Sequence, residues 1–422
     1  MTNQQDNQEK FSYSDKEALA KKFIRVGDEY MKEVFIPDKD GKLFRTYVRR
    51  DKGTVQDDLG KNSDFYRSIK KYEGFCLVPS HTHYQQVVQG FFNEYYQLSH
   101  QPQEGQFPTI LDLLKHIFGD KLDFALDYLQ LLYTKPTQRL PILLLESRAR
   151  GTGKSTFGNL LKLIFQDNSA KLGNAELDSQ FNSIWIKRLV IIVDETSLEK
   201  NSIMQMLKRF STETGKVTSN EKNKAQRQLD FFGKFVFLSN DEGKALPIEK
   251  GENRFAVFKV PTFTETGRKE NPNIESDIAK EIPNFLHFLS KRTLVHTEES
   301  RMYFALESYY TPQLECYYQN SLSPTAKAIK ELIMDSFNYF EEEAELSFSV
   351  SNLYEELEGR MRFLDRSKIK KALIEELNLT EQKKNRYTYH SLKLAERAAI
   401  GSYHPTNENN YHFQFKRQQF QS

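Results

Sequence analysis

Short, almost wholly apolar runs alternate with longer amphipathic stretches in the middle of the chain. The purest runs are Ile142–Leu145 and Leu189–Val193, and a third, Phe235–Leu238, follows them. Apolar runs of this length are typical of strands buried on both faces, and their alternation with helices is typical of a parallel sheet. The pattern therefore predicts an α/β fold, with a parallel-sheet domain over residues 137–261.

The segment before this domain predicts a β-hairpin. Two apolar-rich runs, Glu33–Ile36 and Leu43–Val48, flank a turn-rich stretch that ends in Asp40-Gly41. An Asp-Gly pair between two such runs is a hairpin signal, because both residues tolerate the backbone of a tight turn. We expect two paired strands here.

Farther along, apolar and aromatic residues recur at helical spacing over residues 84–133, with one stripe at 87–96 and another at 110–118. Together with the hairpin, these stripes predict a mostly helical N-terminal α+β domain over residues 23–136. A flexible polar tail over residues 1–22 precedes it.

The segment after the sheet domain predicts two further parts. A polar loop over 262–273 leads into a helix over 274–292, which gives a linker and helical extension over 262–320. A helical, winged-helix-like domain follows over 321–422. Its expected helices and strands lie at 326–340, 350–360, 367–377, 387–389 and 411–415.

Length and composition indicate the number of domains, the degree of order and the cellular location. The chain has 422 residues, and at ~150 residues per domain that length suits two or three domains. Aromatic residues make up 13% of it, which excludes a largely disordered chain. Its two cysteines, Cys76 and Cys316, form no CxxC pair, and no apolar run approaches the ~20 residues of a membrane-spanning helix. We expect a cytoplasmic protein that does not contact a membrane.

A glycine-containing loop lies between the first apolar run and an amphipathic helix. This is the context that a phosphate-binding loop requires, because the loop and helix N–H groups cradle phosphate oxygens. Lys154 would reach the β- and γ-phosphates, and Ser155 would bind Mg²⁺. The full loop pattern has glycine where this chain has Arg148, so the loop entry departs from it. The predicted nucleotide-binding residues are Arg150, Gly151, Thr152, Gly153, Lys154, Ser155 and Thr156.

Two carboxylates end the second apolar run. Asp194 and Glu195 directly follow it, at the carboxyl end of a predicted parallel strand, where α/β proteins bind their ligands. Asp194 would hold Mg²⁺ together with Ser155, and Glu195 would polarise the attacking water. Without the loop, a solvated acidic pair after a core strand would explain both residues equally well.

Asn240 and Arg254 are the remaining catalytic candidates. Asn240 follows the third apolar run and would hydrogen-bond the γ-phosphate or the attacking water. Arg254 precedes a further apolar run and would reach the γ-phosphate bound by a neighbouring subunit, as an arginine finger. Taken singly, a turn asparagine and a surface arginine are the simpler interpretations. With Lys154, Asp194 and Glu195 they complete the predicted catalytic set.

Positive charge is concentrated in one segment. The chain has 60 Lys and Arg against 58 Asp and Glu, a formal net charge of +2, which argues against a polybasic protein. From Lys208 to Lys234, however, seven basic residues stand against three acidic ones. A hairpin in this segment would contact the phosphates of single-stranded DNA, and an ordinary solvated basic loop is the alternative. The predicted DNA contacts are Lys216, Lys222, Lys224 and Arg227.

The C-terminal domain leaves a similar choice open. Lys368, Lys370 and Lys371 on a predicted helix would face DNA phosphates if the domain is a winged helix. A helical domain that binds another protein explains the same pattern equally well.

These pieces, in this order, resemble the superfamily 3 helicases, which are AAA+-like replicative helicases of viruses, phages and plasmids. The resemblance covers Leu140–Pro261, and the upstream stretch Phe75–Gln138 is similar to the region before the ATPase of phage primase–helicases. The loop looks like motif A of that family, the paired carboxylates like motif B, and the strand ending in an amide like motif C. An arginine stands at the family's finger position, and a basic hairpin lies between motifs B and C. The residues concerned are Gly153-Lys154-Ser155, Asp194-Glu195, Asn240 and Arg254.

The resemblance implies a P-loop NTPase core and an ATP-dependent DNA helicase. Such a protein uses ATP and Mg²⁺, assembles as a homo-hexameric ring and moves along single-stranded or forked DNA, in the 3′ to 5′ direction that is usual for the family. It implies DNA replication of a phage or mobile element in the cytosol of a bacterial host, with a primase or replication initiator as partner. The alternative is a non-unwinding DNA-binding NTPase, such as an initiator, a loader or a defence switch. A scaffold protein with a relic loop is disfavoured, because it would not retain the catalytic set.

Overall fold

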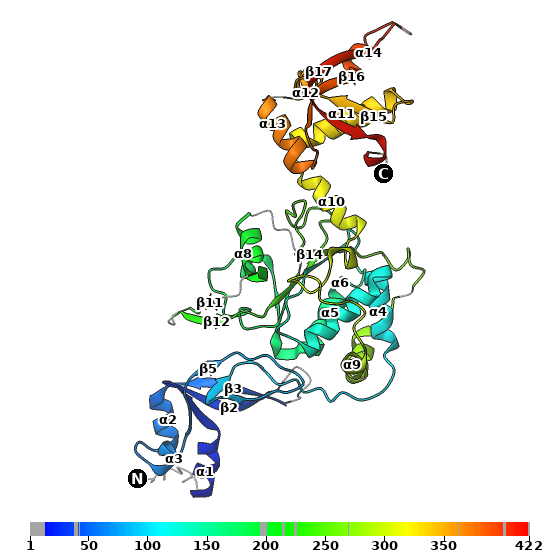
Figure 1. The fold of residues 1–422 in the computed structure, drawn as a ribbon. Coiled ribbons are helices and arrows are strands. Elements are labelled where there is room, and N and C mark those ends of the chain that lie inside the picture. The colour runs from blue at the N-terminus through cyan, green and yellow to red at the C-terminus, as the bar shows by residue number, and fades with distance from the viewer. Residues whose placement is uncertain are drawn as a thin grey trace, which may run out of the picture. The chain divides into compact units, whose positions relative to one another are not determined.

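The structure is a computed structural model of the chain (Figure 1). It divides into two compact units, which are described separately. The first combines Met1–Ala245 with Asn253–Thr311, and the second combines Leu246–Glu252 with Pro312–Ser422. No helix among the residues described is long and apolar enough to cross a membrane. The structure describes residues 13–37, 41, 43–194, 201–212, 216–222, 226–268, 270–361, 363–399 and 402–420.

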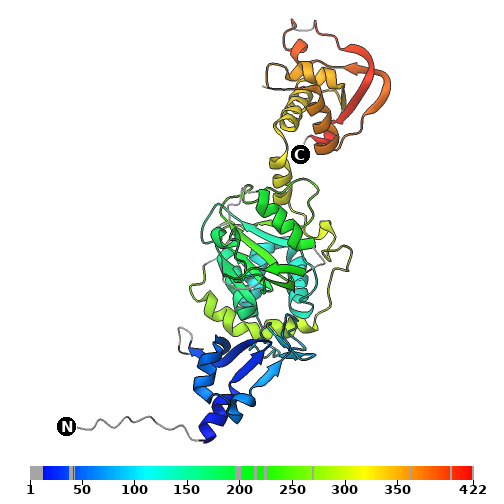
Figure 2. The ribbon, with the colours of Figure 1, turned by 90° about the vertical axis from the view of Figure 1, so that its left-hand side faces the viewer.

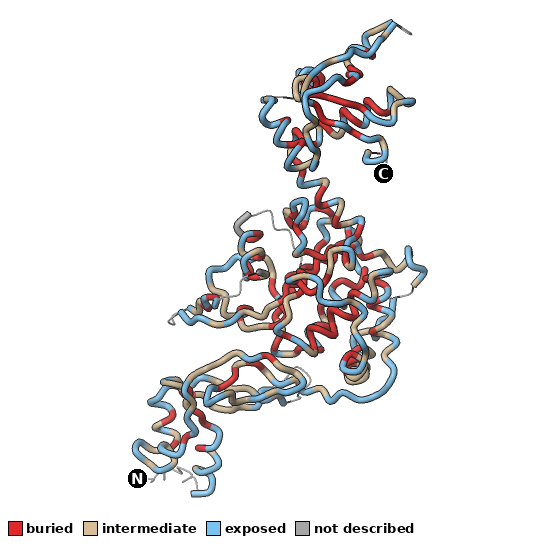
Figure 3. Tube along the Cα trace, in the orientation of Figure 1, coloured by how far each residue is buried: buried red, intermediate tan, exposed pale blue. Residues whose placement is uncertain are grey.

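A sheet of five parallel strands forms the centre of the first unit. The strands are β8 (Ile142–Glu146), β9 (Ser169–Leu172), β10 (Val190–Val193), β13 (Lys234–Ser239) and β14 (Phe255–Lys259). Their order across the sheet is β14-β8-β13-β10-β9. Every residue of β8, β10 and β13 is buried, and these strands form part of the buried trace in Figure 3. The predicted parallel sheet is therefore confirmed.

Four helices pack together on one face of this sheet. They are α4 (Pro108–Phe118), α5 (Leu122–Thr134), α6 (Lys154–Phe165) and α9 (Ile274–Lys291). A Cβ added at Gly158 of α6 would lie 3.1 Å from Leu238 and 3.3 Å from Ile192, so α6 lies directly on the strands. Helix α9 covers α4, α5 and α6, beside which it lies in Figures 1 and 2. The helices predicted at 110–118 and 274–292 are confirmed.

An aromatic cluster covers the other face of the sheet. Phe235 points away from the four helices, because its neighbour Val236 packs against them and side chains alternate along a strand. Trp185 lies edge-on to Phe235 and to Phe210. Phe210 comes from α8 (Asn201–Thr212), and the short helix α7 (Asn174–Leu177) precedes this region.

The stripe at 87–96 is not helical, and that prediction is wrong. It forms β6 (Val87–Val88) and β7 (Phe91–Asn93), which pair in a small sheet with β5 (Phe75–Cys76). Gln89 and Gly90 form the turn between them, with φ of 48° and 85°. Two central residues at positive φ make a tight hairpin, which the helical spacing of the flanking apolar residues conceals.

The N-terminal region combines strands and helices, so it is α+β but not mostly helical, and only that part of the prediction is wrong. Its sheet has the order β3-β2-β1-β4, and the predicted hairpin is confirmed as the antiparallel pair β2 and β3. Residues 1–12 of the predicted tail lie outside the described residues, whereas the rest of it is largely helix α1. The elements are α1 (Tyr13–Lys21), β1 (Phe23–Val26), β2 (Glu29–Pro37), β3 (Leu43–Arg50), α2 (Lys52–Leu59), α3 (Asp64–Arg67) and β4 (Lys70–Tyr72).

The second unit combines helices with an antiparallel sheet of order β15-β17-β16. Its own core includes Ile329, Leu353 and Phe413. The three helices and two strands predicted for the C-terminal domain are confirmed, and β15 is an additional strand. The elements are α10 (Pro312–Ser321), α11 (Pro324–Tyr339), β15 (Glu345–Phe348), α12 (Val350–Leu357), α13 (Arg366–Lys371), a π-helical turn (Ala372–Glu376), β16 (Gln382–Tyr389), α14 (Leu392–Ala395) and β17 (Thr406–Lys416).

Candidate functional site

The loop between β8 and α6 carries the predicted phosphate-binding residues. Gly151 and Gly153 have φ of 66° and 90°, which glycine adopts without the strain that a side chain brings. A Cβ added at Gly153 would lie 3.4 Å from Leu113 of α4, so the loop rests on that helix. The chain then enters α6 at Lys154, which turns the first N–H groups of the helix toward the loop.

A cavity of about 370 Å³ lies beside this loop. Residues 150–156 line it together with Asp194 and Asn240. Because β10 and β13 are parallel, the residues that follow them meet at the same edge of the sheet. The cavity thus gathers the predicted loop, one predicted carboxylate and the predicted amide, while Glu195 lies outside the described residues.

Lys154 is turned onto the loop itself. Its ammonium group donates to the main-chain oxygens of Ser147, at 3.2 Å, and Ala149, at 3.3 Å, and to the hydroxyl of Thr152, at 3.2 Å. Burial lowers the pKa of Lys154, and the nearby charge of Asp194 opposes that shift. Its present partners are neutral oxygens, which an anionic ligand could replace with a stronger, charge-assisted contact.

Asp194 has a cationic partner that the sequence did not suggest. The ammonium group of Lys171 on β9 lies 2.7 Å from its carboxylate, and the Asp194 N–H donates to the main-chain oxygen of Leu172 at 3.0 Å. Strand β9 runs parallel to β10, which brings the two side chains to the same edge of the sheet. Lys171 belongs to no motif, so only the strand pairing reveals it.

The loop entry, where Arg148 replaces the glycine of the common pattern, is held by Glu242. The carboxylate of Glu242 pairs with Lys259 of β14 at 2.7 Å. A hydrogen bond from Lys259 and another from the main-chain N–H of Arg148 lower the pKa of Glu242. The entry is therefore fixed through the carboxylate of a distant residue, which the sequence prediction missed.

Arg254 lies away from the cavity. Its main-chain oxygen accepts a hydrogen bond from the N–H of Ile142 at 2.7 Å, at the start of β8. The glycine loop follows the carboxyl end of β8. Because β14 pairs with β8 in parallel, Arg254 lies at the other, amino end of these strands. Arg254 therefore does not line the cavity of its own chain.

The basic segment forms the predicted hairpin, from β11 (Lys216–Ser219) and β12 (Arg227–Asp230). Lys216 and Lys222 are exposed, and Lys224 lies outside the described residues. Arg227 is held against the upstream region. Its guanidinium lies 3.3 Å from the carboxylate of Glu94 and 4.8 Å from the ring centre of Phe75. Contact with DNA stays a prediction for these residues.

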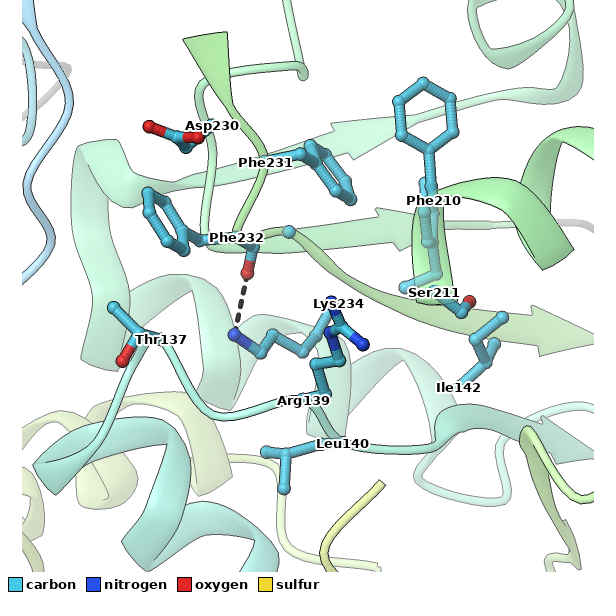
Figure 4. A pocket seen from close by; sticks show the side chains of 12 residues that line it. Thr137, Arg139, Leu140, Ile142, Phe210, Ser211, Asp230, Phe231, Phe232 and Lys234 are labelled. Atoms are coloured by element: carbon cyan, nitrogen blue, oxygen red, sulfur yellow. Dashed lines mark hydrogen bonds between the residues drawn. The ribbon is translucent and has the colours of Figure 1, made fainter. Parts of the chain in front are cut away.

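A separate cavity of about 190 Å³ lies at the other ends of the strands (Figure 4). Lys234 lies within it and donates to the main-chain oxygen of Phe232 at 2.7 Å, the dashed line in Figure 4, and to that of Pro136. Burial lowers the pKa of Lys234 to about 7. Lys234 thus ties the segment before β8 to the base of the hairpin. None of the predicted catalytic residues that the structure describes lines this cavity.

Three comparisons relate the chain to known proteins. Residues 145–254 match a family model described as a family of unknown function, DUF5906. Over 114 residues the chain is 32% identical to the DNA primase-polymerase of Nitratiruptor phage NrS-1, an alignment that covers 26% of this chain and 16% of that protein. The chain therefore spans a small part of this relative.

The fold is also similar to solved structures. The apo structure of the NrS-1 C-terminal region matches with a TM-score of 0.58 and 16% identity, over 92% of this chain and 95% of that one. A second apo form of the region matches with a TM-score of 0.55 and 17% identity, over 84% and 83%. At this level of identity the two proteins share a fold.

Proposed function

We propose that the chain is an ATP-dependent DNA helicase of the superfamily 3 type, with an AAA+-like P-loop core, that acts in replication of a phage or mobile element. The observation that carries this proposal is the cavity in which the glycine loop meets Asp194 and Asn240. A loop that offers N–H groups and a lysine, beside a carboxylate and an amide, suits a nucleoside triphosphate.

Each group has a defined task in this proposal. The loop N–H groups and Lys154 bind the phosphates, and Asn240 holds the γ-phosphate or the attacking water. Glu195, the residue after Asp194, positions and polarises that water.

A magnesium ion fits the residues of the cavity. Ser155 offers an exposed hydroxyl and Asp194 a carboxylate, and oxygen ligands of these kinds are those that Mg²⁺ prefers. Mg²⁺ is usually bound through one or two carboxylates together with substrate phosphates and water, so a single carboxylate and a hydroxyl suit it. When bound, Mg²⁺ would neutralise charge on the phosphates.

The comparisons support a role in DNA replication. The relative that matches over 114 residues is named a DNA primase-polymerase. Because the alignment covers 16% of that protein, the proposal carries over the replication setting and not the polymerase activity. A primase or replication initiator is the expected partner.

Arg254 supports assembly into a ring. It lies at the edge of the sheet opposite to the cavity, so a catalytic role for it requires the cavity of a neighbouring copy. A closed ring, a homo-hexamer by the resemblance, would give every cavity such an arginine. The exposed lysines of the β11–β12 hairpin would then track single-stranded DNA.

The test combines hydrolysis with unwinding. ATP hydrolysis is measured with and without single-stranded DNA, and strand separation is measured on a forked duplex. Wild type should hydrolyse ATP, faster with DNA than without it, and should open the fork. Lys154→Ala should neither hydrolyse ATP nor open the fork. Lys162→Ala changes an exposed lysine on the same helix and should behave like wild type.

Two results would change the conclusion. DNA-stimulated hydrolysis without unwinding would favour the alternative, a non-unwinding NTPase such as an initiator, loader or defence switch. Absence of hydrolysis from wild type under every condition would refute both.

A further inference from the structure

A second cavity, of about 340 Å³, adjoins the proposed nucleotide site. It shares Phe263, Asn271 and Ile274 with the first cavity, so the two are lobes of one hollow. We call the lobe beside the glycine loop the phosphate lobe, and the other the α4 lobe, because helix α4 forms one of its walls. The α4 lobe is lined further by Thr109, Asp112, Leu113, His116 and Arg268.

The α4 lobe has a flat aromatic wall. The ring of His116 stacks on that of Phe263 at 4.7 Å and 20°. His116 is fixed there, because its Nε2 lies 3.1 Å from the main-chain oxygen of Thr152 and its Nδ1 lies 3.2 Å from the hydroxyl of Thr266. Phe263 stands where the lobes join, next to apolar Leu113 and Ile274. Such walls suit a planar heterocycle.

The start of helix α4 does not offer the lobe a second phosphate site. The N–H groups at the start of α4 would bind an anion, but Thr109 and Ile110 already donate theirs to the carboxylate of Glu281, at 3.1 and 2.9 Å. The guanidinium of Arg268 donates to the main-chain oxygen of Asp112. The first N–H groups of α4 and one nitrogen of the Arg268 guanidinium are thus engaged within the protein.

The α4 lobe also contains a hydrogen-bond acceptor. The carboxylate of Asp112 is exposed at the rim of the lobe, and no donor among the residues described pairs with it. A carboxylate accepts hydrogen bonds and repels phosphate, so it favours a ligand group that carries N–H donors.

We propose that the α4 lobe holds the base of the nucleotide, stacked at Phe263, and that Asp112 accepts a hydrogen bond from an exocyclic amine of that base. This inference rests on the proposed function and adds base selectivity to it. Adenine carries such an amine, and hypoxanthine carries a carbonyl oxygen at the same position. Asp112 would therefore make the site prefer ATP to ITP.

The test compares binding of ATP and ITP to the full chain. Wild type should bind ATP roughly tenfold more tightly than ITP, the range expected when a charged acceptor loses its donor. Asp112→Asn replaces one acceptor oxygen by an N–H donor that suits the ITP carbonyl, so its preference should vanish or reverse. Asp120→Asn makes the same charge change at an exposed position beyond α4 and should keep the preference of wild type.

Tripolyphosphate needs only the phosphate lobe, so its unchanged binding to Asp112→Asn shows that the variant is folded. If that variant binds tripolyphosphate and keeps the ATP preference of wild type, Asp112 does not read the base and the inference fails while the proposed function stands. If wild type binds neither nucleotide, the proposed function fails, and the inference with it.

Discussion

The ammonium group of Lys171 lies 2.7 Å from the carboxylate of Asp194, at the edge of the cavity that also holds the glycine loop. In the proposed function Asp194 helps to hold Mg²⁺. The lysine and the metal ion then compete for one carboxylate, and this competition gives the first prediction.

Lys171→Met should lower the Mg²⁺ concentration that half-saturates ATP hydrolysis. Ion pairs with this degree of exposure are worth up to about 1 kcal/mol. The Mg²⁺ concentration at half-saturation should therefore decrease roughly two- to fivefold. A magnesium titration of the hydrolysis rate measures it, with Lys162→Met as the control for loss of a lysine. An unchanged or higher Mg²⁺ requirement would show that Lys171 does not compete for the metal site.

Arg254→Ala should abolish hydrolysis and leave nucleotide binding intact. In the proposed function Arg254 acts on a neighbour, because it lies at the end of the strands opposite to its own cavity. Arginine fingers contribute ~10³-fold or more to turnover, and the loss should be of that order. Mixing Arg254→Ala with Glu195→Gln subunits should restore only a fraction of the activity. Normal hydrolysis by Arg254→Ala alone would remove the finger assignment.

Glu94→Gln should strengthen binding of single-stranded DNA. Glu94 holds Arg227 of the hairpin at 3.3 Å and Lys187 at 2.6 Å, so neutralising it releases basic groups for phosphate. The gain should be roughly two- to fivefold at low salt and should shrink as salt rises. Fluorescence anisotropy with a labelled oligonucleotide measures it, and Glu104→Gln, at an exposed position, is the control.

The same measurement in an Arg227→Gln background separates the two cations. If Arg227 is the released group, adding Glu94→Gln to Arg227→Gln should give little further gain. A full gain in that background would assign the effect to Lys187 instead.

Much of the site could be predicted because its signals are local. The apolar runs that become β8, β10 and β13 are buried on both faces, and the loop, Asp194 and Asn240 directly follow such strands. The turn at Gln89-Gly90 was missed, because the apolar residues around it also fit a helical spacing.

The remaining site residues contact partners that are far away in the sequence, and no spacing rule predicts such contacts. Lys171 meets Asp194 only through strand pairing, and Glu242 meets Lys259 only because β14 joins the sheet. Asp112 reaches the hollow through the packing of α4 beside the loop. Each of these contacts depends on the tertiary arrangement rather than on neighbouring residues.

His81 should make the protein less stable in mild acid. Its ring nitrogens lie 2.7 Å from the main-chain oxygen of Tyr133 and 2.6 Å from the hydroxyl of Tyr95. Burial lowers the pKa of His81 from 6.5 to about 4. The unfolded chain therefore binds the proton more tightly, so stability is fully present above pH 6.5 and is lost as the pH falls toward 4.

The His81 contribution can be isolated by substitution. A shift of this size corresponds to about 3 kcal/mol. Wild type should therefore lose about that much free energy of unfolding, relative to His81→Gln, between pH 7 and pH 4. Urea unfolding at the two pH values measures this change. His83→Gln, at an exposed position, controls for loss of an imidazole. A difference that is constant with pH would contradict the predicted protonation.

Neutralising Asp127 on α5 should reduce the stability of the protein more than most single substitutions. It is fully buried and pairs with the guanidinium of Arg292, which is itself largely buried. It also accepts hydrogen bonds from the N–H groups of Val295, at 3.0 Å, and His296, at 2.7 Å. These contacts fix the chain where it leaves α9, the helix that covers α4, α5 and α6.

Asp127→Asn keeps the shape of the side chain but leaves Arg292 buried without its counter-charge. Breaking a buried pair in this way costs about 3–5 kcal/mol, so the thermal midpoint should fall by several degrees. Asp277→Asn on α9 is the matched control, because its pair with Lys280 at 3.4 Å is exposed and should leave the midpoint unchanged. Removing both charges, in Asp127→Asn with Arg292→Met, should recover part of the loss, because no uncompensated charge then remains buried. If the double variant is less stable than Asp127→Asn alone, the cost lies in lost packing and hydrogen bonds around Arg292 rather than in its unpaired charge.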